Sequence, residues 1–579
     1  MSLIRAYVRL RRSVSWVDPL VFLALAALLY SLVGVGKEWN GVLRPKVDID
    51  LSPLALPKYT FFSLVRGFVA YGISLVFTIV YGYVAAYNRR AEKVMIPLLD
   101  ILQSIPVLGF LPTLVLALVA LFPTSNIGLE LAAVIMIFTG QVWNMTFSFY
   151  NSLRAIPSEL REAGSVYRLG WWRRFTQLEL PYSAIGLIWN SMMSMAGGWF
   201  FLTINEAFVL GTRDFRLPGI GSYMSVAIAN GNVPAMIYAI IAMTTMIVVV
   251  DQFFWRPIVA WAQKYKFEDT EASETEKSFV LDMLRESKLL KFARESVWNP
   301  MYASVSVSVT NGIVALEKRE AISSVQASRL FKKISGWLVT AAMLAAVILG
   351  SWKMFGLFAE VAAAEWLTIF LRLLFTFIRV FVAVVVGTAL MVPAGVAIGL
   401  NPKLSRILQP VAQVAASFPA PMLFPLVIMV LSGAGIGIEI GAVVLMLLGT
   451  QWYILFNVIA GAMGIPQDLR EVANVSRLTK WQVWKRLILP GIFPSLVTGW
   501  VTATGGAWNA SIVAEYVHFG DKTLIATGLG STITDATDAA NFGILAASVL
   551  VMAATVVTIN KLFWKKLYRI AETQYSLNK

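Results

Sequence analysis

The chain has 579 residues, of which 58% are hydrophobic and 14% are charged, whereas a soluble domain carries about 25% charged residues. So much apolar surface cannot all be buried in one globular core and must partly face lipid, which excludes an ordinary soluble enzyme. The chain has no cysteine and one histidine, His518. We therefore expect no disulfide, no thiolate or histidine-rich metal centre and no catalytic residue, and we expect the histidine at the surface.

Apolar stretches of roughly 20 residues can cross the hydrocarbon core of a bilayer, and twelve such stretches occur along the chain. In the first half they lie near 19–36, 61–87, 98–121, 127–150, 182–204 and 233–255. In the second half they lie near 336–358, 366–399, 408–432, 436–462, 491–513 and 541–564. The first stretch lacks a small-residue cleavage site, so we interpret it as a span and not as a signal peptide. The pattern predicts an all-α polytopic membrane protein with about twelve transmembrane helices.

The formal net charge is +15, and its distribution decides between a membrane and a nucleic-acid partner. Four stretches, at 1–17, 154–176, 463–488 and 561–579, together carry +14 and lie beside or between apolar spans. Basic residues confined to alternate loops are the positive-inside signature and not a groove for phosphates. We expect a plasma-membrane protein with both termini in the cytoplasm and no nucleic-acid partner.

The two halves of the chain are copies of one another. Up to the third span the matches are offset by 313 residues: Arg66 with Arg379, Asn88 with Asn401, Pro97 with Pro410, Ser104 with Ser417 and Pro106 with Pro419. From the fourth span on the offset is 309: Trp143 with Trp452, Glu162 with Glu471, Pro181 with Pro490, Glu206 with Glu515 and Gly221 with Gly530. A register kept over so many positions indicates a duplication. Six spans in each copy give two parallel repeats, related by an axis along the membrane normal.

A polar stretch separates the copies, so we predict a first unit at 1–263, a cytoplasmic linker at 264–333 and a second unit at 334–579. Within the linker, 277–297 mixes leucine and phenylalanine with charges and could form an amphipathic helix. Valine alternating with serine before Asn311 and Gly312 indicates a hairpin. The simpler interpretation is a tether between the units, and a regulatory module is the alternative.

The most informative segment lies between the fourth and fifth spans of each half. It runs from Glu162 to Pro181 in the first copy and from Glu471 to Pro490 in the second, and in both the proline lies nineteen positions after the glutamate. Each copy starts after an Ile-Pro turn, repeats an aromatic residue or leucine at every third position, and is predicted to break at its proline before re-entering the membrane. A short charged helix with one apolar stripe can dock in a partner's groove. A helix lying in the lipid interface is the alternative, which two equally spaced copies disfavour.

These two segments resemble the coupling loops of the inner-membrane subunits of binding-protein-dependent ABC importers, which start with Glu-Ala-Ala and end with Leu-Pro. The proline-rich third spans, and the stretches from Trp199 to Gly221 and from Trp508 to Gly530, are similar to the nitrate/sulfonate/taurine branch of that family. The resemblance covers nearly the whole chain, once in each half. It implies two permease units of the type I importer fold fused in one chain.

The resemblance also implies which residues would contact the ATPase subunits. They are Glu162, Ala163, Gly164, Arg168, Gly170, Leu180, Pro181, Glu471, Ala473, Arg477, Leu489 and Pro490. The chain departs from the family where a glycine is expected six residues after the glutamate, because Arg168 and Arg477 stand there. Gly170 could take over the turn in the first copy, but the second copy has Thr479 at that position.

A solute pathway is expected where broken helices meet, because a broken helix inside a membrane is tolerated where it lines a cavity. The candidate residues are Ser104, Pro106, Pro112, Ser417, Pro419, Pro425, Trp199, Glu206, Trp508, Glu515, Arg66 and Arg379. For the prolines a packing kink is an equal alternative, and for the glutamates so is the anchoring of a loop. For the two arginines we favour snorkelling to the interface over the attraction of an anion.

The chain has no Gly-x-x-x-x-Gly-Lys-Ser/Thr phosphate loop, so it cannot cradle ATP itself. The resemblance implies that ATP and Mg are bound by two ATP-binding-cassette ATPase subunits, and that an extracytoplasmic solute-binding protein and membrane lipid are further partners. It also implies a small anionic or zwitterionic solute such as nitrate, a sulfonate, taurine or bicarbonate. The alternative is an ion-coupled secondary transporter, which would need ionisable residues buried in mid-span. Asp251, matched by Asn560, is the main candidate for such a residue.

Overall fold

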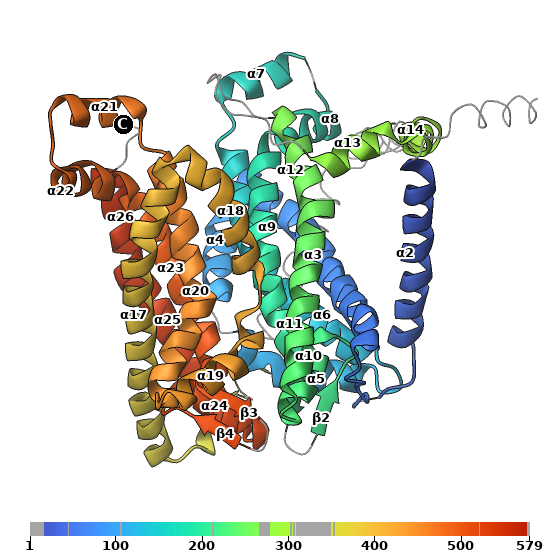
Figure 1. Ribbon diagram of the computed structural model, residues 1–579, viewed down its shortest axis with the longest axis vertical. Coiled ribbons are helices and arrows are strands. Elements are labelled where there is room, and N and C mark those ends of the chain that lie inside the picture. The colour runs from blue at the N-terminus through green and yellow to red at the C-terminus, as the bar shows by residue number, and fades with distance from the viewer. Residues whose placement is uncertain are drawn as a thin grey trace, which may run out of the picture.

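The computed structural model describes residues 17–44, 46–104, 107–167, 169–210, 213–265, 278–301, 304, 307, 349–350, 352, 354–519 and 522–575. Within these ranges nine helices are long and apolar enough to cross a membrane. Figure 1 shows these helices side by side, with α7 (Ser158–Val166) and α21 (Gln467–Val475) at one end of the bundle and the strands at the other. We call these two ends the loop end and the hairpin end.

In the first half five long helices alternate with shorter ones. The long helices are α2 (Val17–Trp39), α3 (Leu56–Tyr87), α6 (Ile127–Arg154), α9 (Leu180–Asn205) and α11 (Val233–Val250). The shorter helices are α4 (Arg89–Ser104), α5 (Leu111–Leu121), α8 (Trp171–Arg174), α10 (Ile220–Ala229) and α12 (Arg256–Ala262). Between α9 and α10 the strands β1 (Ala207–Leu210) and β2 (Arg213–Arg216) pair antiparallel, with Ala207 opposite Arg216.

The second half repeats this order from its second span onward. Its long helices are α17 (Ala363–Leu400), α20 (Ile438–Met463), α23 (Leu489–Ala514) and α25 (Phe542–Ile559). Its shorter helices are α18 (Pro402–Ser417), α19 (Phe424–Gly433), α22 (Lys480–Val483), α24 (Leu529–Asp538) and α26 (Lys565–Gln574). The strands β3 (Tyr516–Phe519) and β4 (Lys522–Ile525) form the matching hairpin, with Tyr516 opposite Ile525.

Most predicted spans coincide with long helices, but the third span of each half does not. The stretches near 98–121 and 408–432 are each divided by a short turn, η2 (Val107–Phe110) in the first half and η7 (Ala420–Met422) in the second. The paired prolines explain the division, because proline removes a backbone donor and clashes with the preceding turn. Most of the span predicted near 336–358 lies outside the described residues.

Two features of the fold were not predicted. Each half carries a β-hairpin and a ten-residue helix, α10 or α24, between its fifth and sixth spans. Over the described residues the chain is thus all-helical, as predicted, apart from these two hairpins of four-residue strands. Strands of four residues give almost no period-2 signal in a sequence, because only two side chains point to each face.

The predicted break at Pro181 is wrong. The helix Trp171–Asn205 is continuous, because a π turn, η3 (Phe175–Glu179), lies just before the proline. In this turn the hydrogen bond reaches five residues back, from the Leu180 N–H to the Phe175 carbonyl. The wider turn gives room to a residue that lacks an N–H and would crowd the carbonyl four residues back. The second copy does the same before Pro490, at η8 (Trp484–Ile488).

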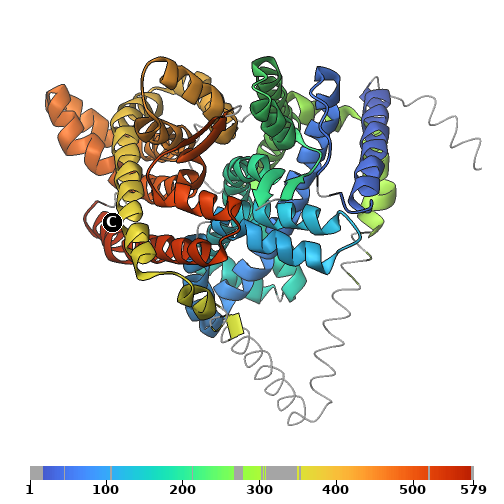
Figure 2. The same ribbon diagram turned by 90° about the horizontal axis from the view of Figure 1, so that it is seen from below.

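The two halves lie side by side, and each sends its broken third span to the other. Helix α18 packs against α9 and α11 of the first half, and α4 packs against α25 of the second half. Figures 1 and 2 show the second half, in yellow to red, beside the first half, in blue to green. One buried hydrophobic cluster joins Val107 and Leu111 of the first half to Trp508 and Leu545 of the second. We call this contact the seam.

Candidate functional site

A buried arginine holds two glutamates together at the hairpin end of the first half. Arg66 on α3 is fully buried, and its Nε and Nη2 donate to the two carboxylate oxygens of Glu130 at 2.5 and 2.8 Å. Its Nη1 donates to Oε1 of Glu206 at 2.7 Å and to the Pro218 carbonyl at 2.8 Å. The planar guanidinium, with five donors in a fixed fork, suits two acceptor groups at once. We call Arg66, Glu130 and Glu206 the first triad.

The first triad also fixes the start of α10. Oε2 of Glu206 accepts the Gly221 N–H at 2.7 Å, and Oε1 accepts the Ser63 hydroxyl at 2.6 Å. The Ser63 oxygen in turn accepts the Ile220 N–H at 2.9 Å. The first N–H groups of a helix have no partner within the helix, and the helix dipole favours a negative charge there. The carboxylate therefore both pairs with the arginine and caps the helix.

The second half repeats the arrangement with Arg379, Glu439 and Glu515, which we call the second triad. Nη1 of Arg379 donates to Glu515 at 2.9 Å and Nη2 pairs with Glu439. The Gly530 N–H donates to Oε2 of Glu515 at 2.8 Å, and Thr376 takes the place of Ser63. The triads differ in solvent access, because the side chain of Glu439 is 54% exposed and that of Glu130 is 1% exposed.

The glycines that follow each glutamate leave room for its carboxylate. A Cβ added at Gly219 would lie 2.2 Å from the Glu206 carboxyl group, and one at Gly528 would lie 2.1 Å from that of Glu515. The φ angles, −176° at Gly219 and −168° at Gly528, are extended and open to any residue. Glycine is therefore needed at these two positions because it leaves space for the carboxylate, and not because the backbone conformation is special. The Gly-x-Gly spacing in the sequence follows from a carboxylate lying against the backbone.

The triads change the interpretation of the two arginines. Arg66 is 0% and Arg379 is 6% exposed, so the expectation that they snorkel to the interface is wrong. The hydrogen bonds of Glu206 and Glu515 are those of loop anchors, and the place of these residues in a solute pathway stays a prediction. Sequence reasoning missed Glu130, although an acid in a predicted span that recurs as Glu439 at the same offset could have identified it.

The two tryptophans before the glutamates are buried against the helices that carry the arginines. Trp199 is 2% and Trp508 is 1% exposed. A Cβ added at Gly67, next to Arg66, would lie 2.7 Å from the Trp199 ring. The Trp508 ring lies 6.4 Å from that of Phe377 on α17. Both tryptophans thus pack against the helices that carry the arginines.

Helices α7 and α21 project beyond the bundle at the loop end (Figure 1). Each begins directly after a proline with extended backbone, Pro157 in the first copy and Pro466 in the second. An Ile-Pro turn ends the preceding helix there, as predicted. The Arg161 side chain donates to the Leu153 carbonyl at 2.8 Å and so caps the last turn of α6.

The outer faces of α7 and α21 carry exposed apolar side chains beside an exposed glutamate. Glu162 and Glu471 are both exposed, while Val166 is 78% and Val475 is 83% exposed. Contact of these residues with ATPase subunits stays a prediction. On the inner faces Gly164 and Ala473 are buried, so the motif's small residues face the bundle and its acids face outward. Leu180, Pro181, Leu489 and Pro490 lie in the first turns of α9 and α23.

The turn after α21 has the hydrogen bonds of a Schellman motif. The Leu478 N–H bonds to the Ala473 carbonyl at 3.2 Å and the Arg477 N–H to the Asn474 carbonyl at 3.0 Å. Such a motif needs a left-handed residue, for which glycine is preferred, and Arg477 occupies it with φ of 50°. The family's glycine position is thus the left-handed position, and Gly170 does not replace it, because Gly170 has φ of −59°. Arg168 lies outside the described residues.

We predict that Arg477→Gly stabilises the protein. The left-handed conformation costs a non-glycine residue roughly 1–2 kcal/mol, part of which the greater freedom of glycine in the unfolded chain offsets. We expect a gain of about 0.5–1 kcal/mol in the free energy of unfolding, measured by thermal unfolding in detergent. Thr479→Gly is the control. Thr479 has φ of −64° and its hydroxyl caps α22, so this change should destabilise. Equal shifts in both variants would contradict the assignment.

The segments 162–181 and 471–490 rest on chemically different bases. Beneath the first, Arg174 and Tyr87 donate to Oε1 of buried Glu179 at 2.8 and 2.7 Å, and the Trp171 indole donates to Tyr83. The residues matched to these five in the second half are Val483, Leu400, Ile488, Lys480 and Val396. Four of them, Val396, Leu400, Val483 and Ile488, belong to one hydrophobic cluster or pack against it. The first segment thus adds a polar network to the apolar packing that both segments have.

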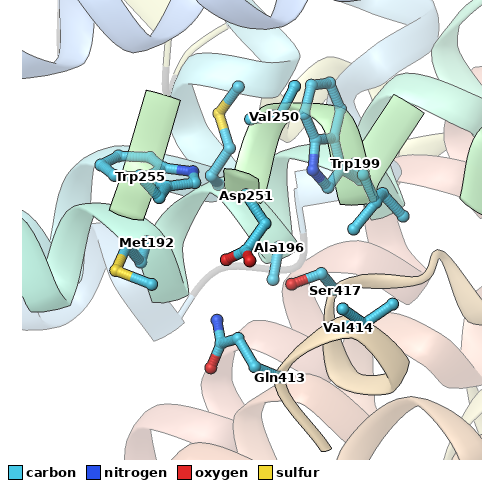
Figure 3. A pocket seen from close by; sticks show the side chains of 11 residues that line it. Met192, Ala196, Trp199, Val250, Asp251, Trp255, Gln413, Val414 and Ser417 are labelled. Atoms are coloured by element: carbon cyan, nitrogen blue, oxygen red, sulfur yellow. The ribbon is translucent and has the colours of Figure 1, made fainter. Parts of the chain in front are cut away.

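A small cavity lies in the seam between α9, α11 and α18. It measures about 10 Å³, which is about the room that one water molecule needs. Figure 3 shows the Asp251 carboxylate on one side of it and the Gln413 amide and Ser417 hydroxyl on the other, with Trp199 and Trp255 alongside. Asp251 also accepts from Arg256 at 3.2 Å. An acid paired in this way is a weak candidate for the coupling-ion site of a secondary transporter.

The residues that the repeat matches to Asp251 and Gln413 carry the same two kinds of group, a carboxyl group and an amide, in exchanged places. By the repeat offsets, Asp100 on α4 corresponds to Gln413, and Asn560, which follows α25, corresponds to Asp251. In the sequence, the carboxyl group and the amide thus come from opposite halves in each of the two pairs.

The candidate pathway residues on the third spans lie in the seam and are mostly buried. The Val107 N–H donates to the Asn509 side chain of the other half at 2.9 Å. A Cβ added at Gly109 would lie 2.5 Å from Val549, also of the other half. Pro112, Pro419, Pro425 and Ser417 are buried. Pro106 and the side chain of Ser104 lie outside the described residues. Exposure of these residues to a solute stays a prediction.

The single histidine lies on the second hairpin, where His518 is 56% exposed, as expected of a surface residue. Its Nδ1 lies 2.9 Å from the Thr523 hydroxyl and its Nε2 lies 3.9 Å from Asp538. Burial raises the pKa of Asp538, and the Tyr516 hydroxyl and His518 oppose that rise. Among the described residues no group of three or more histidine, aspartate or glutamate side chains could hold a metal ion.

The sequence matches a known family twice. The model of the family described as "binding-protein-dependent transport system inner membrane component" matches residues 78–254 and 391–563. The two matches cover more than half of the chain. They begin and end at corresponding points of the two halves, in agreement with the duplication.

Several curated proteins are similar to parts of the chain. The nitrate import permease protein NrtB of Synechocystis sp. is 31% identical over 154 residues, which are 27% of this chain and 51% of that protein. The bicarbonate transport system permease protein CmpB of Synechococcus elongatus is 30% identical over 155 residues, 27% of this chain and 51% of that protein. The taurine transport system permease protein TauC of Escherichia coli is 27% identical over 139 residues, 24% of this chain and 49% of that protein. The chain thus spans about half the length of these relatives.

One solved structure is also similar, that of the MetNI methionine ABC transporter in an inward-facing conformation. It shares 19% sequence identity with this chain, with a TM-score of 0.31. The match covers 36% of this chain and 99% of that one.

Proposed function

Because the chain belongs to the family of binding-protein-dependent transport system inner membrane components, we propose that it is the whole permease of an ATP-binding-cassette importer, with both membrane units in one polypeptide. In this proposal the solute passes through the seam, and separate ATPase subunits open and close it through α7 and α21. One observation carries the proposal. Two matched helices project from the same end of the bundle, with Glu162 and Glu471 exposed on them.

The proposal includes an orientation in which the loop end faces the cytoplasm. It is supported by the stretches 154–176 and 463–488, each with five basic and two acidic residues, because positive charge favours the cytoplasmic side. Two ATPase subunits would then bind one loop each. A solute-binding protein would dock at the opposite end, on the hairpins.

We also propose that the solute is a small anion or zwitterion. The support is the solutes for which the similar proteins are named, in nitrate import, bicarbonate transport and taurine transport. All three solutes are small and carry at least one negative charge.

The experiment that tests the proposal reverses the charge of both exposed acids. We expect the double variant Glu162→Lys/Glu471→Lys to lose solute uptake and copurification of the ATPase subunits, because a lysine would face groups that bind a carboxylate. Both side chains are exposed and lie outside the bundle, so the thermal unfolding temperature should stay within about 2 °C of wild type.

The matched control is Glu286→Lys/Glu295→Lys, which makes the same charge change at exposed positions of the linker and leaves the loops intact. It should keep both uptake and ATPase association. Normal uptake and association in the loop variant would remove the coupling role of α7 and α21. Uptake by the purified chain without any ATPase would overturn the importer proposal itself.

A further inference from the structure

The first linker segment turns back onto the first span and lies across the end of the bundle. It forms α13 (Phe279–Glu286), α14 (Lys288–Ala293) and the π turn η6 (Arg294–Trp298). Figure 1 shows α13 and α14 running across the ends of the spans at the loop end, with α14 just beyond the end of α2. We call residues 278–301 the linker elbow. The predicted amphipathic helix at 277–297 is thus confirmed, as two short helices. The predicted hairpin near 305–312 lies almost entirely outside the described residues.

A buried hydrogen bond fixes the linker elbow to α2. Ser287, between α13 and α14, is fully buried, and its hydroxyl donates to Asp18 in the first turn of α2 at 2.7 Å. The Ser287 oxygen also accepts the Leu290 N–H at 3.2 Å and so caps α14. Helix α13 packs against both α2 and α12. The elbow therefore bridges the first and last spans of the first half.

Helix α2 sets the depth of the elbow relative to the membrane. It has 23 residues, and 11% of its most apolar window is buried inside the protein, so most of its surface faces lipid. At 1.5 Å per residue it is roughly 34 Å long, close to the roughly 30 Å of a hydrocarbon core. Its first turn, and with it Asp18, must then lie at the membrane surface. Ser287 touches Asp18, so the elbow lies at the level of the lipid headgroups.

The exposed side chains of the elbow suit that level. Phe279 is 75% and Trp298 is 61% exposed, and aromatic residues are enriched at the membrane–water interface. Between Ser287 and Trp298 the chain has three basic residues, Lys288, Lys291 and Arg294, against one acid, Glu295. All three basic residues are exposed. Aromatic residues beside lysine and arginine, on helices lying in the plane of the membrane, form an interfacial anchor.

We propose that the linker elbow binds the membrane surface, with Phe279 and Trp298 inserted at the interface and Lys288, Lys291 and Arg294 on the headgroups of anionic phospholipids. The charge complementarity selects anionic over zwitterionic lipid, because basic residues near an anionic surface gain electrostatic energy within a Debye length. This role does not depend on the transported solute or on the ATPase subunits. In this role the linker elbow is anchored to lipid and holds α2 to the rest of the first half.

The chain contains no cysteine, so a single cysteine can be labelled without background. We would attach a nitroxide to Trp298→Cys, and to Glu286→Cys as the matched control, in the full-length chain. The chain would be placed in nanodiscs of phosphatidylcholine, with or without phosphatidylglycerol. Collisions with oxygen, which dissolves in lipid, and with a water-soluble nickel chelate report the depth of each label. The triple variant Lys288→Gln/Lys291→Gln/Arg294→Gln tests the charges.

We expect the label at 298 to collide mainly with oxygen in discs that contain phosphatidylglycerol, and the label at 286 to collide mainly with the chelate. In phosphatidylcholine alone, and in the triple variant, the oxygen preference at 298 should fall several-fold. A label at 298 that stays in water in both lipids would overturn the proposal, and so would a depth that is the same in wild type and triple variant. The proposal would also be overturned if the label at 298 escaped the chelate only after ATPase subunits were added. A protein partner, and not lipid, would then cover the elbow.

Discussion

Arg66→Met is expected to destabilise the protein by about 3–5 kcal/mol, because removing one partner of a buried ion pair leaves an uncompensated buried charge. Here it would leave two, since Glu130 and Glu206 are 1% and 0% exposed. Methionine has a similar length and fills most of the space, so the loss is mainly electrostatic and not a cavity. The measurement is the free energy of unfolding in detergent. The free energy of unfolding of Arg66→Lys should lie between those of wild type and Arg66→Met. Lysine keeps the charge but lacks the fork that reaches both acids.

The duplication supplies the matched control, Arg379→Met. Arg379 also bonds to two glutamates, but the Glu439 side chain is 54% exposed and can be hydrated when its partner is removed. We therefore expect a clearly smaller loss in the second half than in the first. The triple variant Arg66→Met/Glu130→Gln/Glu206→Gln should recover part of the loss, because no charge then remains in the site. Equal losses from Arg66→Met and Arg379→Met, or no recovery in the triple variant, would contradict this account of the first triad.

The spans and the duplication could be predicted because lipid acts on each stretch of chain separately. A run of roughly 20 apolar residues is decided locally, whatever its neighbours are. The breaks in the third spans were equally local, since the prolines near 106 and 419 act through the backbone beside them. The same rule failed at Pro181, where a π turn absorbs the proline. The sequence shows that a helix must adapt to proline but not in which way.

The triads could not be predicted because their members meet only in the folded chain. Arg66 is separated from Glu130 by 64 residues and from Glu206 by 140. Taken alone, an arginine near the end of a span is as consistent with snorkelling as with burial. The duplicated positions contained more information. An arginine and two acids that recur at fixed offsets in spans otherwise nearly free of charge are improbable unless they pair with one another.

The turn after α21 shows a different limit of prediction from the sequence. Arg477 stands where the family has glycine, and from the sequence alone Gly170 is the candidate to replace that glycine in the first copy. The structure places Gly170 at the start of the next helix with φ of −59°, and keeps the left-handed turn at Arg477. The turn is dictated by the hydrogen bonds that close α21, so an unfavourable residue is tolerated and the turn does not move.

Gly219→Ala is expected to cost about 3 kcal/mol, although it adds only one methyl group, at a buried position just before α10. The new Cβ would lie 2.2 Å from the Glu206 carboxyl group, so the carboxylate must move and lose its bonds to Arg66 and to the Gly221 N–H. The control is Gly72→Ala on α3, where a Cβ would meet nothing within 4 Å. That change should be neutral or slightly stabilising, because alanine favours a helix over glycine. Thermal unfolding of the two variants compares them directly.

A double-mutant cycle separates a clash with the carboxylate from a general intolerance of side chains at Gly219. Glu206→Asp shortens the side chain by one methylene and withdraws the carboxyl group from the added Cβ. If the clash is the cause, Gly219→Ala should cost less in the Glu206→Asp background than in wild type, with a coupling of at least about 1 kcal/mol. The same cycle with Gly528→Ala and Glu515→Asp should give the same sign, because a Cβ at Gly528 would lie 2.1 Å from the Glu515 carboxyl group. Additive losses in both halves would show that the glycines are needed for another reason, and the carboxylate would no longer explain the Gly-x-Gly spacing.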